Sequence, residues 1–173
     1  MSPRAAWRLE DLGFERVYDY VPGKADWFAS GLPREGNLAS IPTVGDVVRP
    51  EVPTCSPKEK ASNARERTRE AGWDTCVVVN EERVVFGLVR IKEELESDPA
   101  ATVEEVMVAG PTTYRPNVPV GKAVERMRKR GVPAVLVTTS DGRLIGQLYR
   151  EDAECQTENL RTSENSTSKH LGQ

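Results

Sequence analysis

Residues 102–153 read TVEEVMVAGPTTYRPNVPVGKAVERMRKRGVPAVLVTTSDGRLIGQLYREDA and contain the signals of one small folding unit. The Thr-Val-Glu-Glu lead-in predicts a capping box at the start of a short helix. Pro116 is expected to start a basic helix and Gly131 to end it. Asp141-Gly142 predicts a tight β-hairpin, which leads into another helix start.

The same signals occur earlier in the chain, at a constant offset of 59 residues and without a gap. The matching pairs are Val44 and Val103, Val47 and Val106, Thr54 and Thr113, Pro57 and Pro116, Ala64 and Ala123, Glu66 and Glu125, Arg67 and Arg126, Arg69 and Arg128, Gly72 and Gly131, Val78 and Val137, and Gly87 and Gly146. A repeat of this length is too long for a solenoid unit and indicates a duplicated small domain. We therefore expect two repeats, at residues 43–98 and 102–153.

Both repeats predict the same order of elements. For the first repeat these are a capped lead-in from Thr43, a helix from Ser56-Pro57 to Ala71 with Gly72 as its stop, strands at 75–79 and 84–89, and a helix start at 91–95. For the second repeat the two strands are expected at 134–138 and 144–149. Each long helix has a stripe of buried positions at helical spacing. The expected buried residues are Ala61, Ala64, Thr68 and Ala71 in the first, and Val120, Ala123 and Met127 in the second.

Composition excludes several classes of protein. The 173 residues are 38% hydrophobic and 29% charged with a net charge of −3, so no general attraction to nucleic acid or anionic membranes is expected. The sequence lacks the run of about 18 apolar residues that a membrane span requires, and no signal peptide is indicated. Three distant cysteines and the single histidine, His170, form no metal-binding spacing. We therefore expect a soluble cytoplasmic protein with reduced thiols and no metal.

Residues 1–40 predict a short helix–strand–helix arm, with helices at 2–12 and 25–30 and a strand at 14–20. The stretch AAWRLEDLGFERVYDYVPGKADWFASGLPREG resembles the carboxyl end of a rhodanese (sulfurtransferase) domain. No cysteine precedes the first helix, so the resemblance implies a fragment without that family's catalytic residue. Two origins stay open, a degenerate remnant or a start codon placed too late. At the other end, residues 154–173 are rich in Ser, Thr, Asn and Glu, which predicts a disordered tail.

The two repeats together resemble a tandem pair of CBS (cystathionine β-synthase) domains, also called a Bateman module. The resemblance rests on VGDVV, VPTCSPK and GWDTCVVVNEERVVFGLV in the first repeat and on VEEVM, PTTYRPN and AVERMRKRGVPAVLVTTSDGRLIGQLYREDA in the second. It implies a mixed α/β fold in which two β-α-β-β-α units pack sheet to sheet about a pseudo-twofold axis. It also implies regulatory binding of AMP, ADP, ATP or S-adenosylmethionine in the clefts between the units, no chemical step, and a homodimer.

That family's ribose–phosphate signature is Gly, two mostly apolar residues, Thr or Ser, two free positions, and Asp. From Gly146, the second repeat keeps the spacing and Asp152, but Tyr149 stands where the hydroxyl residue is expected. In the first repeat, Arg90 and Glu93 occupy the two positions. The alternative role of Asp152 and Glu93 is that of first-turn acids that complement the helix dipole.

The resemblance also implies that the adenine base lies against Val132, Pro133 and residues 113–115, or against their equivalents Trp73, Asp74 and residues 54–56. The candidate ligand-binding residues are therefore Asp152, Tyr149, Thr113, Arg115, Val132, Pro133, Arg90, Glu93, Thr54, Ser56 and Asp74. Trp73 is either a stacking partner for the base or a core aromatic residue. Catalytic and metal-binding residues are not expected.

Three functions are compatible with these features. The first is a regulatory module that binds an adenosine-containing ligand and controls a partner protein. The second is a ligand-free interaction or dimerisation module, which the incomplete signatures favour. The third is a truncated sulfurtransferase, which the resemblance of residues 1–40 suggests although the catalytic cysteine is missing. Activity that Cys55→Ser abolishes would indicate this function, but Cys55 and Cys76 are expected to be buried in strands as small apolar residues. The basic helix segments 65–69 and 126–130 are expected to face solvent, which makes nucleic-acid binding a poor further alternative.

Overall fold

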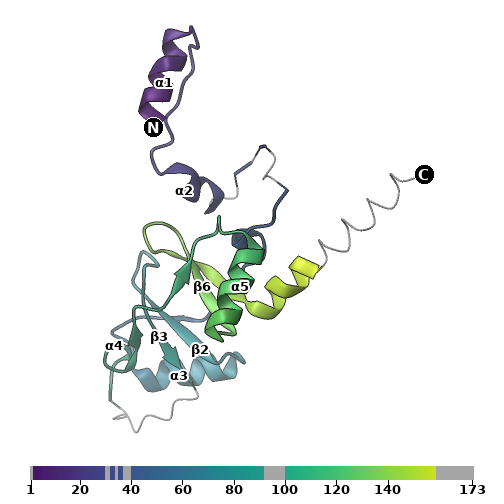
Figure 1. Ribbon diagram of the computed structural model, residues 1–173. Helices are drawn as coiled ribbons and strands as arrows, with labels where there is room; N and C mark the ends of the chain where they lie inside the picture. Colours follow the sequence, from purple (N-terminus) through teal and green to yellow (C-terminus); the bar gives the residue numbers. More distant parts are fainter. Residues whose placement is uncertain (1, 30–31, 34, 37–39, 92–99, 159–173) are drawn as a thin grey trace, which may run out of the picture.

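The computed structural model describes residues 2–29, 32–33, 35–36, 40–91 and 100–158, and two β-sheets form its centre (Figure 1). The first sheet has the order β1 (Thr54–Cys55), β2 (Thr75–Val79), β3 (Val85–Arg90) and β4 (Val108–Ala109). The second has the order β5 (Thr113–Tyr114), β6 (Ala134–Thr138) and β7 (Leu144–Tyr149). The helical elements are α1 (Ser2–Asp11), α2 (Gly23–Ala29), the 3₁₀ turn η1 (Val44–Asp46), α3 (Ala61–Glu70), α4 (Val103–Val106) and α5 (Val120–Arg130). This architecture confirms the predicted mixed α/β fold.

Equivalent strands of the two sheets are paired in the same register. In the first, β1 runs parallel to β2 with Thr54 opposite Val77, and in the second, β5 runs parallel to β6 with Thr113 opposite Leu136. Both pairs differ by the same offset of 59 residues as the sequence repeat. The following hairpins are antiparallel and carry a bulge at equivalent places, after Val78 and after Val137. The repeats are therefore related by a pseudo-twofold operation.

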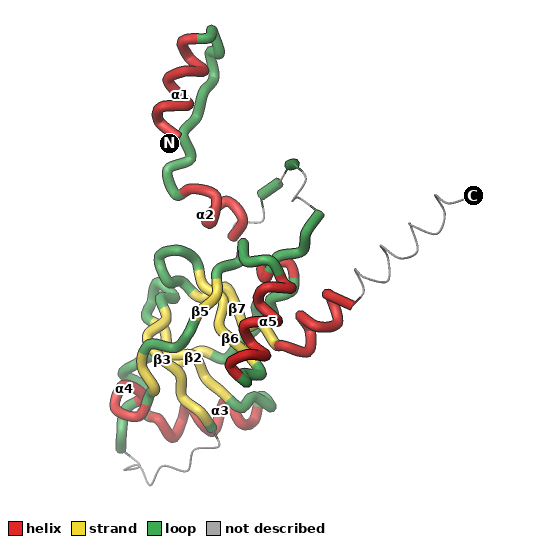
Figure 2. Tube along the Cα trace, viewed as in Figure 1, coloured by secondary structure: helices red, strands yellow, loops and turns green. Residues whose placement is uncertain are grey.

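The strands of the two sheets lie together, with α3 on one side of them and α5 on the other (Figure 2). Alternating residues of each strand face two different layers. In β2, Cys76 and Val78 pack in one core cluster with Ala64 of α3, whereas Val77 and Val79 belong to the cluster that joins the sheets. Leu136 of β6 meets them there from the second sheet. The period-two alternation of a strand thus gives a helix–sheet–sheet–helix sandwich, as the family resemblance implied.

The lead-in of each repeat packs into the other repeat. Val44 is fully buried in the core cluster of the second repeat, and Val103 is fully buried in that of the first. The backbone follows the same exchange, because the Val44 N–H donates to the Val118 carbonyl and the Val103 N–H donates to the Glu59 carbonyl, each at 2.8 Å. The core of each repeat is therefore completed by the lead-in of the other repeat. Residues 43–49 complete the second repeat, and residues 102–108 complete the first.

Both long helices begin later than predicted. α3 begins at Ala61 rather than at Ser56-Pro57, and α5 begins at Val120 rather than at Pro116. The cause is the exchange just described, since carbonyls of the expected first turn accept hydrogen bonds from the opposite lead-in instead of from their own helix. Gly131 does end α5, with φ at 65° in the left-handed region.

The exchanged segments also extend the sheets. β4, which the sequence does not predict, pairs with β3 with Val108 opposite Leu88. At the equivalent place in the second sheet, Arg49 and Gln147 exchange two N–H to carbonyl hydrogen bonds of 2.9 Å. This second pairing is an isolated bridge, whereas β4 pairs with β3 over two residues.

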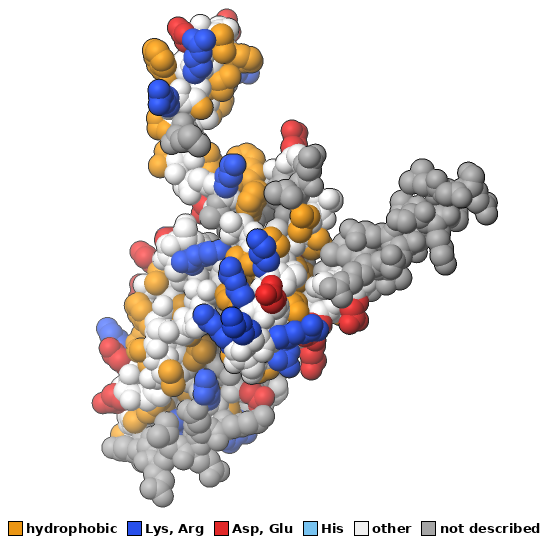
Figure 3. Space-filling view, viewed as in Figure 1, with side chains coloured by type: hydrophobic (Ala, Val, Ile, Leu, Met, Phe, Trp, Pro, Cys, Tyr) orange, Lys and Arg blue, Asp and Glu red, His pale blue; other side chains and the backbone are white. Residues whose placement is uncertain are grey.

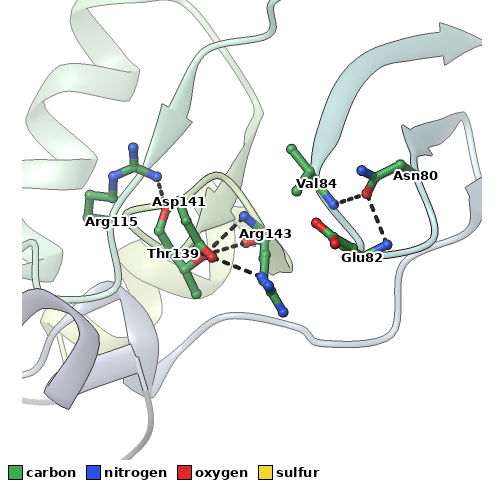
Figure 4. Close-up of polar contacts among 7 residues, drawn as sticks. All are labelled: Asn80, Glu82, Val84, Arg115, Thr139, Asp141 and Arg143. Atoms are coloured by element: carbon green, nitrogen blue, oxygen red, sulfur yellow. Dashed lines mark hydrogen bonds and ion pairs between the residues drawn. The ribbon is translucent and has the colours of Figure 1, made fainter. Parts of the chain in front are cut away.

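The two hairpin turns meet at the pseudo-twofold axis. The Val85 N–H donates to the Gly142 carbonyl at 3.1 Å, and the Leu144 N–H donates to the Arg83 carbonyl at 2.8 Å. Figure 4 shows how each turn is held from within: the Asn80 side-chain oxygen accepts the N–H of Val84 at 2.8 Å. The two hydrogen bonds between the turns, from Val85 to Gly142 and from Leu144 to Arg83, fix the two sheets against each other.

The N-terminal arm differs from its prediction. Residues 14–20, all described, form no strand, because they run without a neighbouring strand to pair with. The helices α1 and α2 are present, and the arm leaves the paired repeats rather than covering them (Figure 1). Trp7 and Phe14 accordingly remain 66% and 59% exposed.

The C-terminal segment is more ordered than predicted. Residues 150–158 are helical, so the predicted disordered tail is wrong for 154–158. The physical reason is contact with α5: Glu154 accepts a hydrogen bond of 2.7 Å from Arg128, and Ala153 is fully buried in the second repeat's core. The rest of the tail, and the predicted helix start at 91–95 beyond Ile91, lie outside the described residues.

Candidate ligand clefts between the repeats

Two clefts open between the repeats. The first, here called the Arg90 cleft, has a volume of about 420 Å³. Its walls include Thr75, Leu88, Arg90, Val108, Thr112, Tyr114, Arg130, Val132, Pro133 and Gln147. The second, the Tyr149 cleft, has a volume of about 440 Å³. It is lined by Arg49, Gly72, Trp73, Asp74, Thr75, Pro133, Ala134, Gln147 and Tyr149.

The pseudo-twofold operation exchanges the two clefts, but their chemistry differs. The equivalent pairs, given as Tyr149 cleft and Arg90 cleft, are Tyr149 and Arg90, Arg49 and Val108, Trp73 and Val132, Asp74 and Pro133. One cleft therefore has a cation at its outer strand and aromatic side chains at its rim. The other has valines, Val108 and Val132, where the first has Arg49 and Trp73, and it has the cation Arg90 where the first has Tyr149.

Arg49 of the Tyr149 cleft lining holds the carboxylate of Asp152, which lies beside the cleft and is not itself part of the lining. The guanidinium donates from Nε to Oδ2 at 2.7 Å and from Nη2 to Oδ1 at 2.8 Å, which is a bidentate pair. Arg49 also lies over the ring of Tyr149, with Cζ 4.7 Å from the centroid, and the Tyr149 ring is 6.3 Å from that of Trp73. Side-chain hydrogen bonding to Asp152 raises the pKa of Arg49, and burial raises the pKa of Tyr149.

In the Arg90 cleft, two buried polar atoms have no hydrogen-bond partner within the described part of the chain. They are the hydroxyl of Tyr114, whose residue is only 6% exposed, and Oε1 of Gln147. Both residues line the Arg90 cleft, but Gln147 lines the Tyr149 cleft as well, so the Tyr114 hydroxyl is the one that belongs to the Arg90 cleft alone. A buried polar group without a partner costs free energy, about 1–3 kcal/mol, so a ligand or water that satisfies these atoms is favoured there.

The predicted ligand residues fall into two groups. Tyr149, Asp74 and Pro133 line the Tyr149 cleft, beside which Asp152 is held by Arg49, and Arg90, Val132 and Pro133 line the Arg90 cleft. Within the described chain, the remaining predictions lie elsewhere, and Glu93 is outside it.

Four predicted residues lie outside the two clefts. Arg115 donates to the Thr138 side chain and to the Thr139 carbonyl at the hairpin turn (Figure 4). The Thr54 carbonyl accepts a hydrogen bond of 3.1 Å from the Arg67 guanidinium. Ser56 lines a separate hollow near Phe86. Thr113 pairs with Leu136 within the second sheet.

Sequence reasoning missed Arg49, Tyr114, Arg130 and Gln147. Tyr114 lies inside the predicted 113–115 segment and lines the Arg90 cleft, whereas the predicted Thr113 and Arg115 are not part of its lining. Arg49 had a signal in the repeat itself, because the offset places this cation on the apolar Val108. Its partner Asp152 is far away in the sequence, which hides the pair from any local motif.

The two strand cysteines are buried, as expected. Cys55 is 4% exposed and Cys76 is fully buried, and both lie in the core cluster of the first repeat. A side-chain hydrogen bond with Cys76, together with burial, raises the pKa of the Cys55 thiol. Because the thiolate is the nucleophile, a buried thiol with a raised pKa argues against the sulfurtransferase alternative.

Basic side chains gather over α5 (Figure 3). Lys122, Arg126, Lys129 and Arg130 of this helix are exposed, in agreement with the predicted solvent-facing role. Among the described residues no helix is long and apolar enough to cross a membrane, and no group of His, Cys, Asp and Glu is placed to hold a metal ion.

Comparison with known proteins identifies the family. The model of the CBS domain matches residues 44–93 and 103–153, which together are more than half of the chain. The chain belongs to the CBS-domain family. Its match begins at residue 44, so the resemblance of residues 1–40 to a rhodanese domain has no support from it and stays a prediction.

A curated protein is similar to this chain over about two thirds of its length. The uncharacterized protein YtoI of Bacillus subtilis (strain 168) is 30% identical over 114 residues, which cover 65% of this chain and 26% of YtoI. The chain thus spans about a quarter of that relative.

Solved structures share the fold. CBSX2 from Arabidopsis thaliana, in its complex with AMP, has a TM-score of 0.59 at 19% identity and covers 69% of this chain and 98% of CBSX2. The CBS domain pair of protein MJ0100, in complex with 5′-methylthioadenosine and S-adenosyl-L-methionine, has a TM-score of 0.58 at 20% identity, with 69% and 98% covered.

Proposed function

We propose that this chain is a regulatory, non-catalytic CBS pair that binds an adenosine-containing ligand in the Arg90 cleft. The observation that carries the proposal is the pair of buried, unpartnered polar atoms there, the Tyr114 hydroxyl and Gln147 Oε1, among the described residues. CBSX2 and MJ0100 support it, because both share this fold and were solved in complex with adenosine-containing ligands.

The walls of the Arg90 cleft suit such a ligand. Val132 and Leu88 offer apolar surface for a base, and Tyr114 and Gln147 offer a hydroxyl and an amide that can pair with its edge. Arg90 and Arg130 line the same cleft and offer cations for phosphate oxygens. The positions favour AMP, ADP or ATP over S-adenosylmethionine, whose sulfonium carries a positive charge.

Tyr114→Phe is expected to lower the affinity for AMP about tenfold while raising the free energy of unfolding of the unliganded protein by about 1 kcal/mol or more, because it removes a buried hydroxyl without a partner among the described residues. The affinity falls because the same substitution removes the contact of this hydroxyl with the ligand. Isothermal titration with AMP, ADP, ATP and S-adenosylmethionine measures the affinity, and urea unfolding measures stability.

Tyr149→Phe is the matched control, since this tyrosine lines the other cleft. It should keep the affinity of the unsubstituted protein. Absence of binding by every ligand at millimolar concentration would refute the proposed function. Equal affinity of Tyr114→Phe and the unsubstituted protein would move the ligand away from this hydroxyl.

A second candidate function is dimerisation, with control of a partner protein. The exposed apolar side chains of the arm favour it, since Trp7, Leu12 and Phe14 are each at least 59% exposed, and burying them in an interface is favourable. Light scattering tests a homodimer directly: a molar mass near twice 19.2 kDa is expected, and a monomer at all concentrations contradicts it.

A further inference from the structure

We propose that Arg49 is an internal plug: the Tyr149 cleft is as large as the Arg90 cleft, but Arg49 occupies the Asp152 carboxylate beside it, so that the chain binds one nucleotide rather than two. The inference rests on the proposed function for the Arg90 cleft and adds a specificity residue to it. A carboxylate at the position of Asp152 is what the ribose hydroxyls of a nucleotide would need in this cleft. That carboxylate is already held by the Arg49 guanidinium through both of its oxygens.

The plug consists of more than one ion pair. Arg49 is positioned by its backbone, which pairs with Gln147 on β7, and by the ring of Tyr149 beneath its guanidinium. Tyr149 in turn lies beside Trp73 across the mouth of the cleft. A nucleotide must therefore displace a bidentate pair and a cation–π contact before its ribose reaches Asp152.

The Arg90 cleft has no such occupant at the equivalent place. The repeat offset puts Val108 where the other cleft has Arg49, and the valine side chain has no charge to offer a carboxylate. The difference between the two clefts follows from this one position on the exchanged lead-in. Arg49→Val would make the two repeats alike there.

The pair can be removed without removing the fold. The Arg49 side chain is 56% exposed. Exposed ion pairs contribute little to the free energy of unfolding, about 0–1 kcal/mol. The backbone bonds of residue 49 to Gln147 do not depend on the side chain. The chain also offers a matched control, Arg67, whose side chain is 55% exposed and pairs bidentately with Glu59 away from both clefts.

The test is the number of AMP molecules bound per chain, measured by isothermal titration and equilibrium dialysis. We expect about one for the unsubstituted protein, about two for Arg49→Val, and about one for Arg67→Val. The second site of Arg49→Val should disappear again in Arg49→Val/Asp152→Asn. Two sites in the unsubstituted protein, or an unchanged number in Arg49→Val, would overturn the plug.

The fluorescence of Trp73 locates the new site. In a Trp7→Phe/Trp27→Phe background, Trp73 is the remaining tryptophan and it borders the Tyr149 cleft. AMP should change its emission in Arg49→Val at least tenfold more, at equal concentration, than in the chain that keeps Arg49. If the unsubstituted protein binds no AMP but Arg49→Val binds one with this signal, the plug stands and the function proposed for the Arg90 cleft fails. If neither protein binds AMP, both fail.

Discussion

Gly146→Ala is expected to lower the free energy of unfolding by about 3 kcal/mol or more, which is the upper range for a substitution that overpacks a core. A Cβ built on Gly146 lies 2.8 Å from the carbonyl carbon of Arg49 and 2.9 Å from Cγ2 of Val48. The first of these atoms is backbone and is held in place by its pairing with Gln147. The added methyl group can therefore be accommodated only if the exchanged lead-in leaves the sheet.

Urea unfolding followed by circular dichroism measures this loss, and Gly121→Ala is the control. Gly121 lies within α5 and has nothing within 4 Å of a built Cβ, so alanine there should stabilise by about 0.8–1 kcal/mol through helix propensity. If Gly146→Ala unfolds at the same urea concentration as the unsubstituted protein, the close crossing of residue 49 over β7 is refuted.

The same glycine illustrates what the repeat can and cannot predict. The sequence places Gly146 at the start of a ligand signature, whereas the structure gives it a packing role beneath Arg49. Its equivalent Gly87 has the same role, with the Val108 carbonyl 2.9 Å from a built Cβ. A motif derived from ligand-binding relatives does not separate these roles, because both require a residue without a side chain.

Local elements could be predicted well because their signals are local. The strands at 75–79 and 134–138 agree with β2 and β6, and the capping box at Thr102 is present with a Thr102 N–H to Glu105 distance of 2.7 Å. The helix starts at Pro57 and Pro116 could not be predicted in this way. The carbonyls of Pro57 and Pro116 accept hydrogen bonds from N–H groups of the opposite repeat's lead-in. A single sequence does not indicate which repeat a lead-in joins.

The features of the candidate site that recur at the 59-residue offset could be predicted from the sequence. The offset correctly pairs the two clefts, and it shows that Tyr149 and Arg90 replace the expected hydroxyl residues. It does not predict that Asp152 already has a cation, since Arg49 reaches it only when the lead-in of the first repeat crosses β7. The Tyr149 cleft differs from the Arg90 cleft by this tertiary contact between Arg49 and Asp152.

Removal of residues 2–49 is expected to abolish cooperative folding of the second repeat, whereas removal of residues 2–40 leaves it intact. The longer deletion removes Val44, which is fully buried, together with the half-buried Val47 and Val48 that pack on the same cluster. At about 1.5–3 kcal/mol for each buried side chain of this size, the loss approaches the whole stability of a small domain. Native-state hydrogen exchange and urea unfolding of the two truncated chains measure it.

The two deletions differ by only nine residues, which makes the comparison a test of the exchange itself. The shorter deletion keeps Pro42, whose carbonyl accepts the Val120 N–H at 3.0 Å, and it removes only the arm that leaves the paired repeats (Figure 1). Restoring residues 41–49 as a separate peptide should recover slow exchange in β6 and β7, because the peptide supplies the missing core side chains. If the 2–49 deletion retains full protection in those strands without the peptide, the second repeat builds its core alone. The sequence boundary at the start of each repeat would then also be its folding boundary.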